Sequence, residues 1–148
     1  MNPSVSEILT GALNALSDPP PPESAGEFTG GKVSVIALLS FLCAQEAESG
    51  AAVRAAENRS MRLLFGEAAR NDWAQAHTAL LAELGQGHDG DLHISALDQA
   101  NAELRRALIK LQAAVEDDPE PAARPRERRI AALLLDFARA RDLKLPGQ

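Results

Sequence analysis

Apolar residues recur at intervals of three and four along most of this chain, and no stretch alternates with a period of two. This spacing predicts amphipathic α-helices rather than strands. Ser4 and Glu7 have the spacing of a capping box, so the first helix is expected to begin there. The four prolines Pro19–Pro22 are expected to end it, because proline cannot continue a helix. Residues 18–31 are then expected to form a connector rich in proline and glycine.

The most apolar part of the chain extends from about Lys32 to Glu48. Its central residues, VSVIALLSFLCA, are apolar on nearly every side of a helix. A helix of this kind is usually buried at the centre of a bundle. The segment is therefore expected to be a buried central helix, and Ser49-Gly50 is expected to stop it.

Four further helices are predicted downstream. They are expected over residues 51–65, from Asn71 or Asp72 to Leu84, over residues 92–116 and over residues 125–143. In the first of these the charged residues are expected to face water: Arg54, Glu57, Arg59 and Arg62. Residues 117–125 are expected to link the longest helix to an arginine-rich last helix. The predicted fold is all-α, a single domain over residues 1–148 built as a bundle of five or six helices with one nearly all-apolar central helix.

The composition supports a helical core. The chain has 28 Ala and 21 Leu but no Tyr and one Trp, and alanine and leucine are strong helix formers. The scarcity of aromatic residues disfavours an aromatic-lined pocket. Cys43 is the only cysteine, which excludes an intrachain disulfide and a cysteine-based zinc site. Its place in the apolar segment is typical of a buried residue.

Nothing in the sequence indicates export or a membrane span. The first residues, MNPSVSEIL, carry no basic region and no long apolar stretch. The longest apolar run is about a dozen residues, short of the roughly 20 that a membrane-spanning helix needs. We therefore expect a cytoplasmic protein without a membrane partner.

The charge is unevenly distributed. The net charge of −6 argues against general binding of nucleic acid. Seven basic and three acidic residues make the segment from Arg124 to Lys144 +4, which leaves −10 for the rest. Three arginines near the start of the last helix are candidates for contact with phosphate or an acidic partner: Arg126, Arg128 and Arg129. Alternatively, they are solvated or paired with the acidic stretch EDDPE just upstream.

The stretch GEFTGGKVS, from Gly26 to Ser34, nearly matches a phosphate-binding loop. Such a loop needs a preceding β-strand and a hydroxyl residue after the lysine, whereas here a proline run precedes it and Val33 follows Lys32. The sequence therefore favours the N-cap and first turn of the apolar helix. Lys32 then opposes the helix dipole, which leaves it as a candidate contact for an anion or an acidic partner.

A second candidate site lies in the loop after residue 87. His88, Asp89, Asp91 and His93 are together able to ligate a divalent metal, although the same residues also describe an ordinary polar turn before a helix. No cofactor is indicated. There is no G-x-S-x-G motif for a nucleophile.

Three runs of residues carry a resemblance to a known family: FTGGKVSVIALLSFLCAQEAESGAAVRAAENRSMRLLFG, LLAELGQGHDGD and LRRALIKLQAAVEDDPE. Residues 4 to about 120 resemble a bacterial helical family classed as a domain of unknown function. Its members occur alongside aminoglycoside-phosphotransferase-like kinases and acyl-CoA dehydrogenases. The shared features stand at Glu46–Gly50, Leu64–Gly66 and Leu108–Leu111. Members of the family commonly have an Arg or His at the entry to the apolar helix, where this chain has Gly30-Gly31-Lys32. The resemblance implies an accessory or interaction role near a small-molecule kinase or CoA-linked metabolism, and it carries over no catalytic residue.

These observations predict a non-catalytic helical protein that binds a partner protein or itself, as a homo-oligomer. The alternative is a small-molecule or metal-binding protein, or an enzyme, that uses Gly26–Lys32 or His88–His93.

Overall fold

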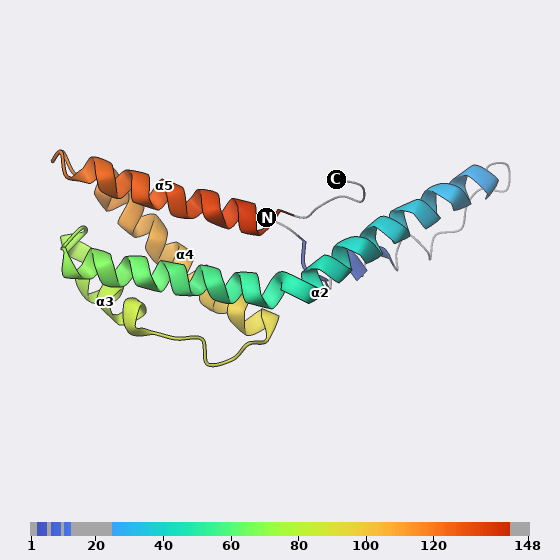
Figure 1. Ribbon diagram of the computed structural model, residues 1–148, viewed down its shortest axis with the longest axis horizontal. Helices are drawn as coiled ribbons and strands as arrows, with labels where there is room; N and C mark the ends of the chain where they lie inside the picture. The colour runs from blue at the N-terminus through green and yellow to red at the C-terminus, as the bar shows by residue number, and fades with distance from the viewer. Residues whose placement is uncertain (1–2, 6, 10, 13–24, 143–148) are drawn as a thin grey trace. The chain divides into compact units, whose positions relative to one another are not determined.

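The computed structural model describes residues 3–5, 7–9, 11–12 and 25–142 (Figure 1). In chain order the helices are α2 (Ala25–Arg70), the short 3-10 helix η2 (Gln75–His77), α3 (Thr78–Gln86), α4 (Ile94–Glu116) and α5 (Ala123–Ala140). Described residues between 5 and 12 are also helical, and no strand occurs in the described ranges. The predicted all-α class is therefore confirmed.

The chain packs as two compact units. One comprises Met1–Gly50 with Leu143–Gln148, and the other comprises Ala51–Asp142. Helix α2 contributes residues to both. The single domain expected from the sequence stays a prediction.

The first unit contains the predicted capping box. The backbone N–H of Ser4 donates to Oε2 of Glu7 (2.7 Å), and the backbone N–H of Glu7 donates to Oγ of Ser4 (3.2 Å). Both bonds satisfy backbone donors that a helix start leaves without an intrahelical partner. The predicted start of the first helix is confirmed, whereas Pro19–Pro22 lie outside the described residues.

The connector predicted over residues 18–31 is wrong where the structure describes it, because α2 begins at Ala25. Glycine weakens a helix by about 1 kcal/mol but does not forbid it, and the prolines that do forbid it end at Pro22. Lys32 therefore lies about two turns inside α2 instead of in its first turn. The dipole argument for an anion at Lys32 no longer holds, and GEFTGGKVS forms helix rather than a glycine loop.

The apolar segment of α2 is not the buried centre that its composition suggests. Four of its large apolar side chains are between 38% and 60% exposed: Val33, Val35, Leu38 and Phe41. Four others are half-buried: Ile36, Leu39, Leu42 and Cys43. The expectation of burial is wrong because only one side of this all-round apolar helix is partly covered.

Helix α2 also continues through the glycines that mark stops in the sequence, Gly50 and Gly66. A glycine stops a helix when it adopts a left-handed conformation, and no proline follows Gly50 to prevent the helix from continuing. The next residues, Ala51-Ala52, are strong helix formers. The separate helix predicted over residues 51–65 is therefore part of α2.

A Schellman motif ends α2 at Arg70. Asp72 has a positive φ of 50°. Its backbone N–H donates to the carbonyl of Ala69 (3.5 Å), and that of Trp73 donates to the carbonyl of Ala68 (3.0 Å). Asp72 thus closes α2 instead of capping the following helix, and α3 begins later than the sequence predicts.

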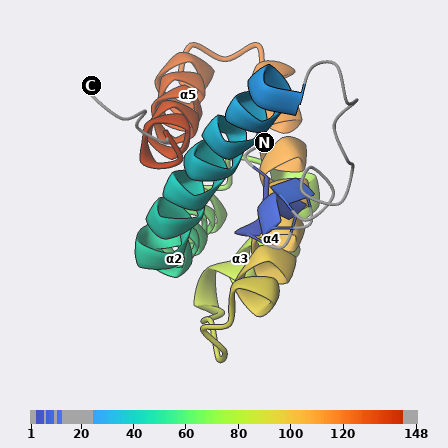
Figure 2. The ribbon, with the colours of Figure 1, turned by 90° about the vertical axis from the view of Figure 1, so that its right-hand side faces the viewer.

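The α-helices of the second unit, whose courses Figures 1 and 2 show, all contribute residues to one apolar core. Its members include Met61, Phe65 and Ala68 of α2, Leu81 of α3, Leu104, Leu108, Leu111 and Val115 of α4, and Ile130 and Phe137 of α5. Helix α5 runs antiparallel to α2, because Arg129 pairs with Glu67 and Arg141 pairs with Glu57. The bounds of α4 and α5 lie within three residues of the predicted ones, so these two helices are confirmed.

Gly85 of α3 packs directly on Gly66 of α2. A Cβ added at Gly85 would lie 2.8 Å from the backbone N and 3.0 Å from the Cα of Gly66. We expect Gly85→Ala to lower the free energy of unfolding by about 1–3 kcal/mol, because backbone atoms of a helix cannot move aside. Urea denaturation followed by the fluorescence of Trp73, the sole tryptophan, measures this loss in the second unit.

Gly66→Ala is the matched control for this prediction. Its Cβ would lie at an ordinary contact distance of 3.4 Å from Nη1 of Arg70. We expect a change between zero and a gain of about 1 kcal/mol, because alanine is the better helix former. Equal losses in the two variants contradict the close approach of α3 to α2.

Candidate functional site

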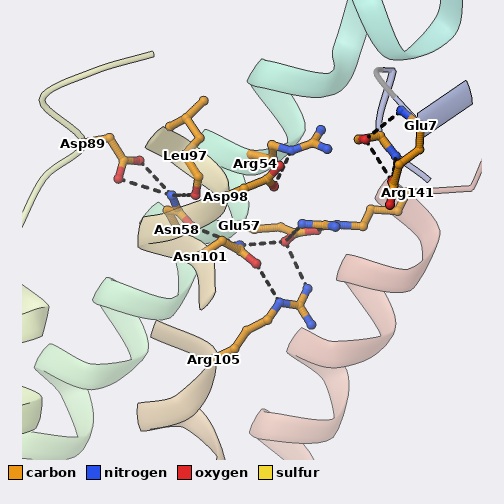
Figure 3. A network of polar contacts seen from close by, with 11 residues as sticks. Glu7, Arg54, Glu57, Asn58, Asp89, Leu97, Asp98, Asn101, Arg105 and Arg141 are labelled. Atoms are coloured by element: carbon orange, nitrogen blue, oxygen red, sulfur yellow. Dashed lines mark hydrogen bonds and ion pairs between the residues drawn. The ribbon is translucent and has the colours of Figure 1, made fainter. Parts of the chain in front are cut away.

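Glu57 is the most deeply buried charged residue described in the second unit, and Figure 3 shows its contacts. Glu57 of α2 is only 2% exposed, and its two oxygens accept four hydrogen bonds. Arg141, directly after α5, donates Nε to Oε1 (2.6 Å) and Nη2 to Oε2 (2.8 Å). Arg105 and Asn101 of α4 donate to the same Oε2, at 3.1 Å and 2.9 Å. Glu57 therefore ties three helices together.

The network extends from Glu57 into the loop before α4. Nδ2 of Asn101 also donates to Oδ1 of Asn58 (2.9 Å). Asn58 is fully buried and donates to Oδ1 of Asp89 (3.2 Å), an atom that also accepts from Nη1 of Arg62 (2.8 Å). One connected set of polar groups thus joins α2, α4, the loop and the end of α5.

The environment of Glu57 sets its protonation state. Burial raises the pKa of the carboxyl group. The hydrogen bonds and charge of Arg141, with the hydrogen bonds from Arg105 and Asn101, outweigh that effect and hold the pKa below its usual value of 4.5. Glu57 is therefore ionised at neutral pH.

A carboxylate in this state is poorly suited to catalysis. Three donors from Arg141, Arg105 and Asn101 converge on Oε2 and a fourth, from Arg141, reaches Oε1, and the residue is only 2% exposed. A general base must instead reach the proton that it abstracts from a substrate. The arrangement fits a structural role in which Glu57 fixes how α4 and α5 align with α2.

The four residues predicted to bind a metal do not come together. Asp89 is held by Asn58 and Arg62, while Asp91 pairs with His93. His88 is exposed. Across the described ranges, no group of three or more His, Cys, Asp or Glu side chains is arranged to hold a metal ion. The loop therefore has the geometry of the ordinary polar turn.

Two of the three candidate arginines make contacts within the second unit. Arg126 pairs with Asp118 (3.0 Å), and its guanidinium lies 5.8 Å from the ring centre of Trp73. Arg129 pairs with Glu67 of α2 (3.3 Å). The pairing of Arg126 agrees with the alternative that places these arginines against the upstream acidic stretch.

The other two candidate contact residues differ in exposure. Arg128 is exposed and Lys32 is half-buried. The contact with an outside partner that the sequence suggests for the arginines and Lys32 stays a prediction.

The residues of the polar network were missed by sequence reasoning, and the expectation that Arg54 and Glu57 face water is wrong. Both are buried, and Arg54 donates Nε to Oδ1 of Asp98 (2.6 Å). A signal was nevertheless present. Glu57 lies one turn before Met61, on the face of α2 that forms the core. A polar residue at a core position indicates a buried partner.

No known protein family, curated protein or solved structure matches this chain.

Proposed function

We propose that this chain is a non-catalytic helical protein that acts by binding another protein surface. The observation that carries the proposal is the exposed apolar side of α2, where Val33, Val35, Leu38 and Phe41 stand within nine residues. Clustered apolar residues of this kind mark interaction surfaces, whereas single exposed ones need no explanation. The burial of Glu57 and its four hydrogen bonds to neighbouring side chains support a role other than catalysis.

A membrane is the competing occupant of this apolar surface. Part of α2, Gly31–Arg70, is long and apolar enough to cross a membrane by length and composition, with a mean hydropathy of 1.2 over its best 18 residues. Its uninterrupted run of apolar and serine residues, however, extends only from Val33 to Ala44. Twelve helical residues span about 18 Å, well short of the roughly 30 Å of a hydrocarbon core. A helical protein surface needs no such length and fits better.

The resemblance described above supports an accessory role beside a small-molecule kinase or an enzyme of CoA-linked metabolism. In this proposal the chain contributes contact surface rather than chemistry. The partner covers the exposed side of α2.

A photo-crosslinking residue placed at Leu38 tests the proposal in the producing cell. We expect a discrete protein adduct, which is the partner or a second copy, and loss of that adduct in Val35→Asp. The matched control carries the crosslinker at Ile109 of α4, an isolated apolar residue that is 66% exposed, and forms no adduct.

Vesicle flotation supplies the opposing outcome. The purified chain is mixed with vesicles of phosphatidylethanolamine and phosphatidylglycerol and centrifuged through a density gradient. Absence of an adduct at Leu38, or flotation of the chain with the vesicles, contradicts a protein partner on this surface.

A further inference from the structure

A second exposed apolar surface lies in a groove between α2 and α5. The groove has a volume of about 200 Å³ and is lined by Ser60, Leu63 and Leu64 of α2 and by Arg129, Ala132, Leu133 and Asp136 of α5. Leu63 is 68% exposed although its neighbours Met61, Leu64 and Phe65 belong to the core. All of these residues belong to the second unit, so this surface is separate from the exposed side of α2 in the first unit.

The charges along the groove have a definite order. Arg129 and Asp136 line the same groove, seven residues and about two turns apart on α5, so they project from nearly the same side of the helix. Between them stand the small Ala132 and the apolar Leu133. The surface therefore has an apolar centre with a positive charge at one end and a negative charge at the other.

We infer that a second copy of this chain docks in this groove, with α5 antiparallel to α5 of the first copy. A two-fold axis between Ala132 and Leu133 places Arg129 of each copy opposite Asp136 of the other. A two-fold interface uses the same patch on both copies, and this patch is complementary in charge to its own reversed image. This inference rests on the proposed function, in which the chain acts by binding protein surfaces. It adds a second copy of the chain as a partner and the groove as a further surface.

Packing and existing contacts are compatible with this dimer. Ala132 lies opposite Leu133 of the other copy, and a small residue against a large one lets two helices approach closely. Arg129 already pairs with Glu67, and Asp136 lies 3.9 Å from Arg139, but the side chains of Arg129 and Asp136 are 63% and 72% exposed. Exposed pairs of this kind contribute little, so they do not prevent the contact between copies. Docking also covers Leu63.

Sedimentation of the full chain over a range of concentrations tests the inference. We expect a reversible dimer of twice the 15.7 kDa chain mass. Leu63→Asp and Arg129→Asp should each raise the dissociation constant of the dimer at least about tenfold. The first places a charge in the apolar centre, and the second places two negative charges opposite each other. Circular dichroism checks that each variant keeps its helices.

The reciprocal exchange of charges decides the geometry. In the double variant Arg129→Asp/Asp136→Arg the opposite charges face each other again, so the dissociation constant should return to within about threefold of the native value. The intramolecular pair with Glu67 is lost in both the single and the double variant, so it does not account for the recovery. Arg106→Asp, at an exposed residue of α4, makes the same change in net charge as Arg129→Asp alone and should leave the dimer intact.

Three results overturn the inference: a monomer at every concentration, a dimer that Leu63→Asp does not weaken, and a failure of the double variant to recover. None of them bears on the adduct at Leu38, because that experiment reads a different surface. A failure of the proposed function is therefore distinguishable from a failure of this dimer.

Discussion

Replacing Phe65 by alanine is expected to lower the free energy of unfolding by about 4 kcal/mol. Phe65 is fully buried in the core of the second unit. Removing a buried phenyl ring loses its transfer free energy and leaves a cavity that neighbouring helices fill only in part, which costs about 3–5 kcal/mol. A small domain has only about 5–15 kcal/mol in total, so the variant keeps little of its stability.

Urea denaturation followed by Trp73 fluorescence measures this loss, because Trp73 packs against the same core. Ile109→Ala is the matched control. Ile109 is 66% exposed, so its truncation should change the free energy of unfolding by less than about 0.5 kcal/mol. A loss below about 1 kcal/mol in Phe65→Ala contradicts the core as described.

The helical class and the later helices could be predicted because their signals are local. In α4, the apolar residues Leu97, Leu104, Leu108 and Leu111 recur at intervals of three, four and seven, and all are buried. Such a stripe predicts a helix with one buried face, whichever neighbouring element covers that face. The observed α4 therefore differs from the predicted helix by only two residues, at its start.

The course of α2 could not be predicted because its signals are ambiguous. Glycine appears both in helix stops and within helices, and its effect of about 1 kcal/mol is small beside tertiary packing. Gly66 lies inside a helix here, and the missing side chain of Gly85 is what lets α3 approach its backbone. The actual stop is at Asp72, whose positive φ is uncommon for a residue other than glycine.

The polar network could not be predicted because its partners are far apart in the sequence. Arg141 follows Glu57 by 84 residues, and Asn101 follows it by 44. Before the fold is known, a glutamate among arginines on a helix is most simply read as a solvated face. The pairing of Arg129 with Glu67 could not be predicted for the same reason, since the two residues are 62 apart in the sequence.

The second large effect is expected at Glu57. We expect Glu57→Ala to lower the free energy of unfolding by about 3 kcal/mol, because removing one partner of a buried ion pair leaves the others without compensation. The value lies at the lower end of the usual range because Arg105 and Arg141 reach water, with side chains 39% and 23% exposed. Denaturation followed by Trp73 fluorescence measures this loss.

An exposed pair of the same chemistry is the control for Glu57→Ala. Arg124 pairs with Glu127 one turn away on α5, and the side chain of Arg124 is 78% exposed. Glu127→Ala should change the free energy of unfolding by less than about 0.5 kcal/mol. Equal effects at Glu57 and Glu127 contradict a buried network.

The pH dependence of stability separates the charge of Glu57 from its packing. The folded state holds the pKa of Glu57 below 4.5, so the contribution of the carboxylate is complete above that pH. It is lost as the pH falls from about 4.5 through the lower pKa of the folded state, because the unfolded chain takes up the proton first. Glu57→Gln lacks this contribution, so its free energy of unfolding should fall less steeply than that of the native chain over the same range. Parallel curves for the two proteins would mean that Glu57 acts through its size alone, and the alignment of α4 and α5 on α2 would then need no ionised carboxylate.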